Sequence, residues 1–388
     1  MRRIGALLLR VLRGLRTAWE IAGVTALLLL LLLLGVLAVR ALRGPSQSEA
    51  ERADHPYHGQ AWFPVYRREF DASLQMEWEP YVYWRRRAMH GEFVNVDEEG
   101  LRRTVQAPSA SAAPRRVFFM GGSTMWGTGQ RDAWTIPSLV ASGLAARNVR
   151  DLELTNFGET GYVSTQELLR LEMALRKGAR PDVVVFYDGI NDAASSAQST
   201  ECGLPQNESR RSFEFALGRF LTQRTRRDLG ALVRTARSRA LAGVAGASAD
   251  PALLAGGIVN CYARTARIVE MLSREYGFAV LYFWQPTPAT SPKPLTPYEA
   301  AVVDTASPEA LHRMLWQLNR LSAGRIDSVM RPVAGERFQN LAAIFADDSS
   351  AVWLDYIGHV TESANARIAG AMLEPIVRAL ALTARTKK

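Results

Sequence analysis

The stretch RVFFMGGSTMWGTG, Arg116 to Gly129, passes from an apolar run into a glycine-rich turn that carries a serine. The apolar residues Val117 to Met120, bounded by arginine on one side and glycine on the other, are typical of a buried β-strand. No lysine follows the glycines, so the turn does not fit a phosphate-binding loop of the Walker type. We therefore interpret Ser123 as a candidate nucleophile, exposed where the strand ends.

Further apolar runs along the chain repeat this pattern. The strand candidates are Leu152 to Asn156, Val183 to Tyr187 and Phe278 to Trp284, and segments with helical period such as Ser164 to Lys177 separate them. Strands that alternate with helices predict a parallel sheet with helices on both faces. Ligands bind such sheets beyond the carboxyl ends of the strands, so the residues directly after each run are the site candidates.

Polar residues with chemical capacity stand at these places. Gly158, in NFGETGYVSTQE, offers a backbone N–H, and Asn191, in GIND, offers an amide donor for a developing oxyanion. Asp355 shortly precedes His359 near the C-terminus, and such a pair supplies the orienting carboxylate and the base that a serine hydroxyl needs. Taken singly, each stretch also fits an ordinary turn or a helix cap.

Taken together, the four stretches resemble the SGNH hydrolases, the GDSL-like esterase and acylhydrolase superfamily, over residues 116–381. The resemblance implies that Ser123 is the nucleophile, that His359 is the base and that Asp355 is its acidic partner. It also implies an oxyanion hole made by the N–H groups of Ser123 and Gly158 and the amide of Asn191. The implied fold is a flavodoxin-like three-layer α/β/α sandwich with a mostly parallel five-stranded sheet, and the implied chemistry uses no cofactor and no metal.

Two departures from the family pattern are visible. The first motif reads GGST where the family has GDSL, and three residues separate Asp355 from His359 where the family usually has two. The motifs FYDGIND, Phe186 to Asp192, and FWQP, Phe283 to Pro286, make the chain look like the membrane-anchored, extracytoplasmic members of the superfamily.

The N-terminal region predicts a membrane anchor. Ile21 to Val39 is uncharged and contains the unbroken leucine run Leu27 to Leu34, which is long enough for a helix to cross a bilayer. The run exceeds the ~7–15 residues usual for a signal peptide, so we favour an uncleaved single-pass helix over a cleaved signal. Arginines are denser before the run than after it, which predicts a cytoplasmic segment at 1–20 and an extracytoplasmic domain on the cell membrane.

The remaining segments divide by composition. Residues 40–61 read as a tether, and residues 62–115 form an aromatic-rich extension that ends in a hairpin around Glu99 and Gly100 and in a small-residue linker. The hydrolase domain follows at 116–381, with a tail at 382–388. A basic helical excursion at 209–257 interrupts the strand and helix alternation, either as solvated helices that pack on the core or as a lid or membrane-surface patch.

Charge and cysteine content limit which classes of partner and metal site the chain can have. The net charge is +9, but arginine is spread along the chain and is not interleaved with aromatic residues, so no nucleic-acid partner is expected. Cys202 and Cys261 form a disulfide if the compartment is oxidising, or otherwise remain two thiols. Two cysteines without histidines at ligand spacing make no zinc site.

These observations predict a serine ester hydrolase. Its substrate is expected to be an acyl ester of an envelope glycan or lipid, cleaved through an acyl-enzyme intermediate. One alternative is an O-acyltransferase that uses the same residues to acylate an envelope glycan. Another is a non-catalytic glycan-binding or scaffold protein that retains the fold.

Overall fold

The computed structural model describes residues 19, 22–28, 30–31, 33–35, 53–306 and 310–386. The chain divides into two units, 1–58 and 59–388. In the first unit, residues 22–28, 30–31 and 33–35 are helical. Among the described residues, no helix is both long and apolar enough to span a bilayer. Parts of the predicted segments 1–20, 21–39 and 40–61 lie outside the described residues.

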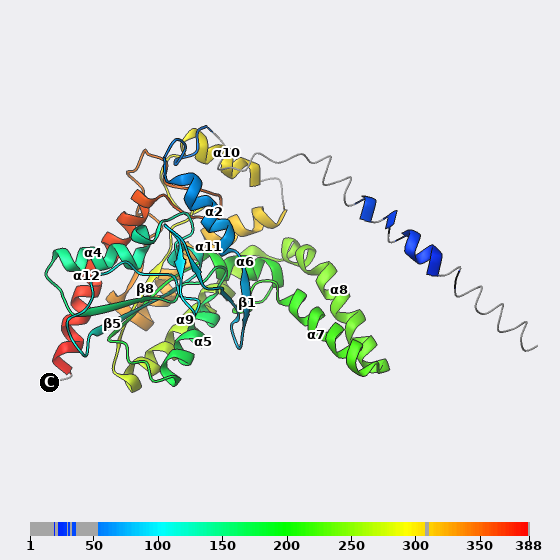
Figure 1. Ribbon diagram of the computed structural model, residues 1–388, viewed down its shortest axis with the longest axis horizontal. Helices are drawn as coiled ribbons and strands as arrows, with labels where there is room; N and C mark the ends of the chain where they lie inside the picture. The colour runs from blue at the N-terminus through cyan, green and yellow to red at the C-terminus, as the bar shows by residue number, and fades with distance from the viewer. Residues whose placement is uncertain are drawn as a thin grey trace, which may run out of the picture. The chain divides into compact units, whose positions relative to one another are not determined.

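A five-stranded sheet forms the centre of the second unit (Figure 1). Its strands are β5 (Arg115–Gly121), β6 (Leu152–Asn156), β7 (Val183–Asp188), β8 (Ala279–Trp284) and β9 (Phe338–Asn340), in the order β6-β5-β7-β8-β9. All four neighbouring pairs are parallel. This is the order of the flavodoxin-like fold, as predicted. β9 was not predicted, because its three residues contain no apolar run.

Helices cover both faces of the sheet, because successive strand side chains point to opposite sides. Val117 and Phe119 belong to one buried cluster, and Phe118 and Met120 belong to the other. The first cluster includes residues of α4 (Ile136–Ala146) and α12 (Glu362–Thr386). The second includes residues of α5 (Ser164–Arg176), α6 (Ile190–Ser199), α9 (Pro251–Tyr276) and α11 (Ala310–Ala334). The short α10 (Pro297–Ala306) precedes α11 in the chain.

The aromatic-rich extension contains a helix and short antiparallel strands. These are α2 (Phe63–Ser73), β1 (Met76–Glu79), β2 (Tyr83–Arg86), β3 (Met89–His90) and β4 (Asn95–Val96). The predicted hairpin around Glu99 and Gly100 is confirmed, because Val96 bridges Arg102 across this turn. The hairpin that joins β1 to β2 was not predicted, because its strands are short and carry charged residues.

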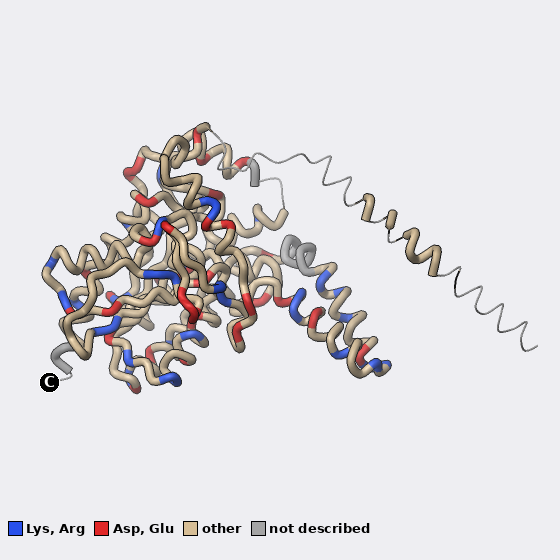
Figure 2. The backbone as a smooth tube through the Cα atoms, in the orientation of Figure 1, with Lys and Arg blue, Asp and Glu red and all other residues tan. Residues whose placement is uncertain are grey.

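The predicted basic excursion is helical, but its boundary was wrong. It consists of α7 (Glu208–Gln223) and α8 (Arg226–Ser248), which pack against each other, and basic residues are spaced along both helices (Figure 2). α9 begins at Pro251 and buries Ile258 and Val259 in the core, so the excursion ends before α9. Cys202, which follows α6, forms a disulfide with Cys261 of α9, and their Cα atoms are 6.2 Å apart.

Candidate active site

The candidate nucleophile lies where β5 ends. The short helix α3 (Ser123–Trp126) begins at Ser123, which is buried at the sheet's carboxyl edge. The Ser123 Oγ hydroxyl donates a hydrogen bond to His359 Nε2 at 2.7 Å. A Cβ atom on Gly122 would lie 2.0 Å from Asn191 Nδ2, so only glycine fits before the serine. The sequence-predicted pair of Ser123 and His359 is therefore in direct contact.

Asp355 is bound to the other side of the His359 ring. His359 Nδ1 donates a hydrogen bond to Asp355 Oδ2, while Asp355 Oδ1 accepts the backbone N–H groups of Ile357 at 3.0 Å, Gly358 at 3.0 Å and His359 at 3.1 Å. The loop closes through the Leu354 N–H, which donates to the His359 carbonyl at 2.8 Å. The extra residue between acid and base is thus accommodated, because two of the three intervening residues donate to the carboxylate.

Electrostatics keep Asp355 ionised. Burial raises the pKa of Asp355, but the nearby His359 and the backbone N–H donors together outweigh it, so the pKa lies below its ordinary value. An ionised carboxylate only accepts, so the proton of the neutral imidazole stays on Nδ1. His359 Nε2 is then free to accept the proton of Ser123.

Asn191 reaches the same place from the N-terminal end of α6, after β7. Its Nδ2 donates to the Tyr162 carbonyl at 2.8 Å and lies beside Gly122. An amide nitrogen carries two hydrogens, so the second remains for a ligand. The neighbouring Asp192 accepts from the Ser164 hydroxyl at 2.7 Å, and this bond joins the first turns of α5 and α6.

The predicted role of Gly158 does not agree with its hydrogen bonding. Its N–H donates to Asn156 Oδ1 at 2.9 Å, within its own turn. A Cβ atom at Gly158 would lie 2.5 Å from the Trp126 backbone nitrogen, so the glycine is needed for close packing against α3. We conclude that Gly158 shapes the turn, and that its N–H is already used.

Gly161 is a second candidate donor in this loop, and the sequence analysis did not single it out. Within the part of the chain that the structure describes, its N–H donates no hydrogen bond, and the next residue, Tyr162, supplies the carbonyl that holds Asn191. Its φ of +76° is a conformation that favours glycine. The sequence signal was the second glycine of NFGETG, five residues after Asn156, but the pattern did not show which glycine had the free N–H.

The N-terminal extension packs against the short helix α3 that begins at Ser123. The guanidinium carbons of Arg86 and Arg102 lie 4.2 and 4.3 Å from the ring centre of Trp126, in the helix that Ser123 begins. Both arginines are fully buried. Arg86 forms an ion pair with Glu159 of the Gly158–Gly161 loop, and Arg102 forms one with Asp132. The extension therefore contacts both the nucleophile helix and the loop that carries Gly161.

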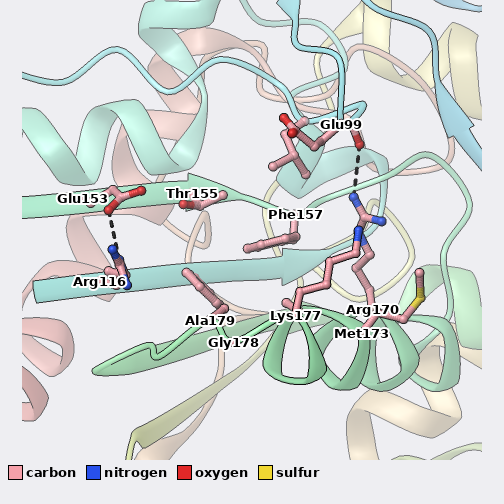
Figure 3. A pocket seen from close by; sticks show the side chains of 13 residues that line it. Glu99, Arg116, Glu153, Thr155, Phe157, Arg170, Met173, Lys177, Gly178 and Ala179 are labelled. Carbon is pink, nitrogen blue, oxygen red and sulfur yellow. Dashed lines mark hydrogen bonds and ion pairs between the residues drawn. The ribbon is translucent and has the colours of Figure 1, made fainter.

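A cavity of about 390 Å³ lies elsewhere, beside β5, β6 and α5 (Figure 3). Arg116 pairs with Glu153 on one side of it, and Arg170 donates to the Glu99 carbonyl on the other. Ser123 and His359 do not line this cavity, so it is separate from the candidate site. Among the described residues, no cluster of three histidine, cysteine or acidic side chains is arranged to hold a metal ion.

A serine, a histidine and an aspartate joined in series at the carboxyl edge of a flavodoxin-like sheet define the class of serine hydrolases. The family follows from the sequence comparison. Residues 119–312, half of the chain, match the family described as GDSL-like Lipase/Acylhydrolase, and the protein belongs to this family of ester-bond hydrolases. The match ends before Asp355 and His359, so the support for these two residues comes from the sequence motif and from their hydrogen bonds to each other and to Ser123.

Solved structures of esterases are similar to this chain. An acetyl xylan esterase, AlAXEase, has 17% sequence identity, with 67% of this chain and 99% of that chain covered and a TM-score of 0.38. The psychrotrophic esterase EstA from Pseudoalteromonas sp. has 12% identity, 68% and 97% coverage and a TM-score of 0.37. A variant acetyl xylan esterase from Geobacillus stearothermophilus has 14% identity, 69% and 94% coverage and a TM-score of 0.36. No curated protein matches the chain.

Proposed function

We propose that this protein is a serine esterase that removes an acyl group from an extracytoplasmic glycan. The observation that carries the proposal is the continuous hydrogen-bonded series of Ser123, His359 and Asp355. Ser123 Oγ attacks the ester carbonyl carbon while His359 Nε2 takes its proton. The tetrahedral intermediate then collapses, and His359 returns the proton to the departing alcohol. Water, deprotonated by His359, then attacks the acyl-enzyme, and His359 returns the proton to the departing Ser123 Oγ as the carboxylic acid is released.

The oxyanion is stabilised by three donors from three strand ends. These are the backbone N–H of Ser123, the backbone N–H of Gly161 and the second hydrogen of Asn191 Nδ2. Fixed donors of this kind act on the charge that develops in the tetrahedral intermediate, and removing one costs roughly 10²–10³-fold in kcat.

The choice of a glycan over a lipid rests on the β1–β2 hairpin. Trp78 and Trp84 are opposite each other in its register, so their side chains share one face. Trp84 donates from its indole to the Thr160 carbonyl at 2.8 Å, beside the candidate donor Gly161, while Trp78 is 66% exposed. The two tryptophans form an aromatic face that begins beside the Gly158–Gly161 loop and includes the exposed Trp78. Such a face suits stacking against the C–H face of a sugar ring.

The location of the enzyme is a separate part of the proposal. The apolar run at 21–39 and the arginine excess before it support a membrane anchor with the catalytic domain outside the cytoplasm. The disulfide between Cys202 and Cys261 supports an oxidising compartment. Protease added to cells whose outer envelope is permeabilised and whose cytoplasmic membrane is intact should degrade the domain and spare the basic N-terminal segment; a protected domain would refute the location.

Two assays test the activity and the substrate. A fluorophosphonate should label the protein, and p-nitrophenyl acetate should be hydrolysed, with both signals lost in Ser123→Ala; an unlabelled, inactive protein would rule out the esterase. Trp78→Ala should raise KM for an O-acetylated oligosaccharide at least fivefold and leave KM for p-nitrophenyl acetate unchanged. Leu253→Ala, which shortens another exposed apolar side chain, is the matched control. An unchanged oligosaccharide KM in Trp78→Ala would argue against the glycan.

A further inference from the structure

We propose that Gln206 is a positioning residue that fixes the orientation of the Asn191 amide in the oxyanion hole. This inference rests on the proposed esterase function. Gln206 lies between α6 and α7, outside the four stretches that carry the family resemblance. Its Nε2 donates to Asn191 Oδ1 at 3.2 Å, and it makes no contact with the reacting Ser123 hydroxyl that would give it a direct role.

The direction of this hydrogen-bond series is set by a backbone carbonyl. The Tyr162 carbonyl only accepts, so Asn191 must present Nδ2 to it, and Asn191 Oδ1 must then face the opposite way. Asn191 Oδ1 also only accepts, so Gln206 must present Nε2 to it. Rotating the Asn191 amide by 180° would place Asn191 Oδ1 against the Tyr162 carbonyl oxygen. It would also replace the N–H donor toward the oxyanion with an acceptor. The hydrogen bond from Gln206 Nε2 to Asn191 Oδ1 further stabilises the observed orientation of the amide.

The backbone of Gln206 is itself held from two sides. On the N-terminal side, the disulfide ties Cys202 to α9, and Ser195 Oγ donates to the carbonyl of Leu204. These contacts fix the segment Cys202–Gln206 between two core helices, α6 and α9.

On the C-terminal side, the guanidinium of Arg211 donates to the Gln206 carbonyl. Arg211 in turn lies over the rings of Tyr83 and Trp84, at 4.8 and 4.5 Å from their centres. A Cβ atom at Gly161 would lie 3.7 Å from the Gln206 amide and 3.5 Å from the Trp84 ring. Gln206 therefore packs between the two loop donors, Asn191 and Gly161, and the N-terminal extension.

The test is a double-mutant cycle with p-nitrophenyl acetate as substrate. Gln206→Ala should lower kcat about tenfold, the size of one hydrogen bond, with KM within about twofold. In the Asn191→Ala background, the same substitution should change kcat by less than twofold, because Gln206 acts only through Asn191. A general structural role would lower kcat equally in both backgrounds, and that result would overturn the inference.

A second variant gives a readout that folding defects do not mimic. In Gln206→Glu, the ionised carboxylate cannot donate to Asn191 Oδ1, whereas the protonated carboxyl can. The ratio of its kcat to that of the unsubstituted protein should therefore rise as pH is lowered from 8 to 5, while the ratio for Gln206→Ala should stay flat. If Gln206→Ala does not fold, a flat ratio for Gln206→Glu still refutes the inference.

The control variant is Gln198→Ala. Gln198 of α6 is partly exposed and accepts the Asn207 N–H at 3.0 Å, and this hydrogen bond does not involve Asn191, so kcat should be unchanged. An unsubstituted protein without Ser123-dependent hydrolysis would overturn the esterase and this inference together. An active protein whose Gln206→Ala variant keeps full kcat would overturn this inference alone.

Discussion

At the scale of single residues, Asp355 is the member of the Ser123–His359–Asp355 triad that departs from the family pattern, because three residues separate it from His359. Asp355 nevertheless contacts His359 directly, because its second oxygen is held by three backbone N–H groups of its own loop. The carboxylate is therefore fixed before it orients the imidazole. In this loop the hydrogen bonds, and not the number of intervening residues, decide which acid contacts His359.

Asp355→Asn should therefore be severely impaired. The asparagine would either lose the acceptor for His359 Nδ1 or lose its backbone donors, which leaves the imidazole in the wrong tautomer. We expect kcat for p-nitrophenyl acetate to fall by roughly 10³–10⁴-fold with little change in KM. Asp347→Asn, at an exposed site nearby, should behave like the unsubstituted protein. A loss below tenfold in Asp355→Asn would assign the orienting role to another acceptor.

At the scale of elements, the N-terminal extension is an integral part of the catalytic domain. Arg86 at the end of β2 bonds Thr160 at 2.6 Å and Glu159 through its backbone N–H at 2.9 Å, and its guanidinium lies over Trp126. Its side chain is fully buried, so its charge depends on the paired Glu159. The hairpin thus joins the oxyanion loop to the nucleophile helix.

Arg86→Met should destabilise the fold strongly. Removing one partner of a buried ion pair leaves the other charge uncompensated, which costs roughly 3–5 kcal/mol. The neighbouring Arg87 is 61% exposed and pairs with Glu77 at 3.8 Å, so Arg87→Met should change the free energy of unfolding by less than about 0.5 kcal/mol. Urea unfolding measures both variants. Equal stability of the two would mean that the extension is not part of the folded core.

At the scale of the whole molecule, three buried carboxyl groups link stability to pH. Glu167 of α5 and Asp188 of β7 interact, Tyr262 of α9 donates to Asp188 at 2.9 Å, and Asp192 lies nearby in α6. Burial raises the pKa of Glu167 well above its ordinary value, that of Asp188 to about 7 and that of Asp192 to about 6. The folded protein therefore holds protons that the unfolded chain has already released.

The sign of the pH dependence follows from these raised pKa values. The stabilisation is fully present below pH ~4, where the unfolded chain is protonated too, and is lost as pH rises through the folded pKa values. Glu167→Gln should remove part of this loss. The free energy of unfolding of the variant, relative to that of the unsubstituted protein, should therefore increase between pH 4 and pH 7. Glu172→Gln in the same helix is the control. Parallel stability curves for Glu167→Gln and the unsubstituted protein would contradict the assignment.

The sequence alone predicted the parallel sheet and singled out Ser123 and His359 as candidates for nucleophile and base. Continuous apolar runs identified four of the five strands, because burial on both faces demands continuous apolar residues. Ser123, Asn191 and His359 were found because they follow or flank such runs, where the carboxyl ends of parallel strands converge. The membrane anchor at 21–39 also rests on the sequence, and it stays a prediction.

Only the tertiary structure showed that the Gly158 N–H is already hydrogen-bonded, and only it assigned contacts to Gln206 and Arg86. Gly158 and Gly161 both fit a turn, and no local pattern encodes that Asn156 accepts the N–H of Gly158. Gln206 and Arg86 reach the site from segments without a motif, through the disulfide and the β1–β2 hairpin. Local propensity and periodicity specify which residues form each element, whereas the partner of a single polar group depends on how distant elements pack.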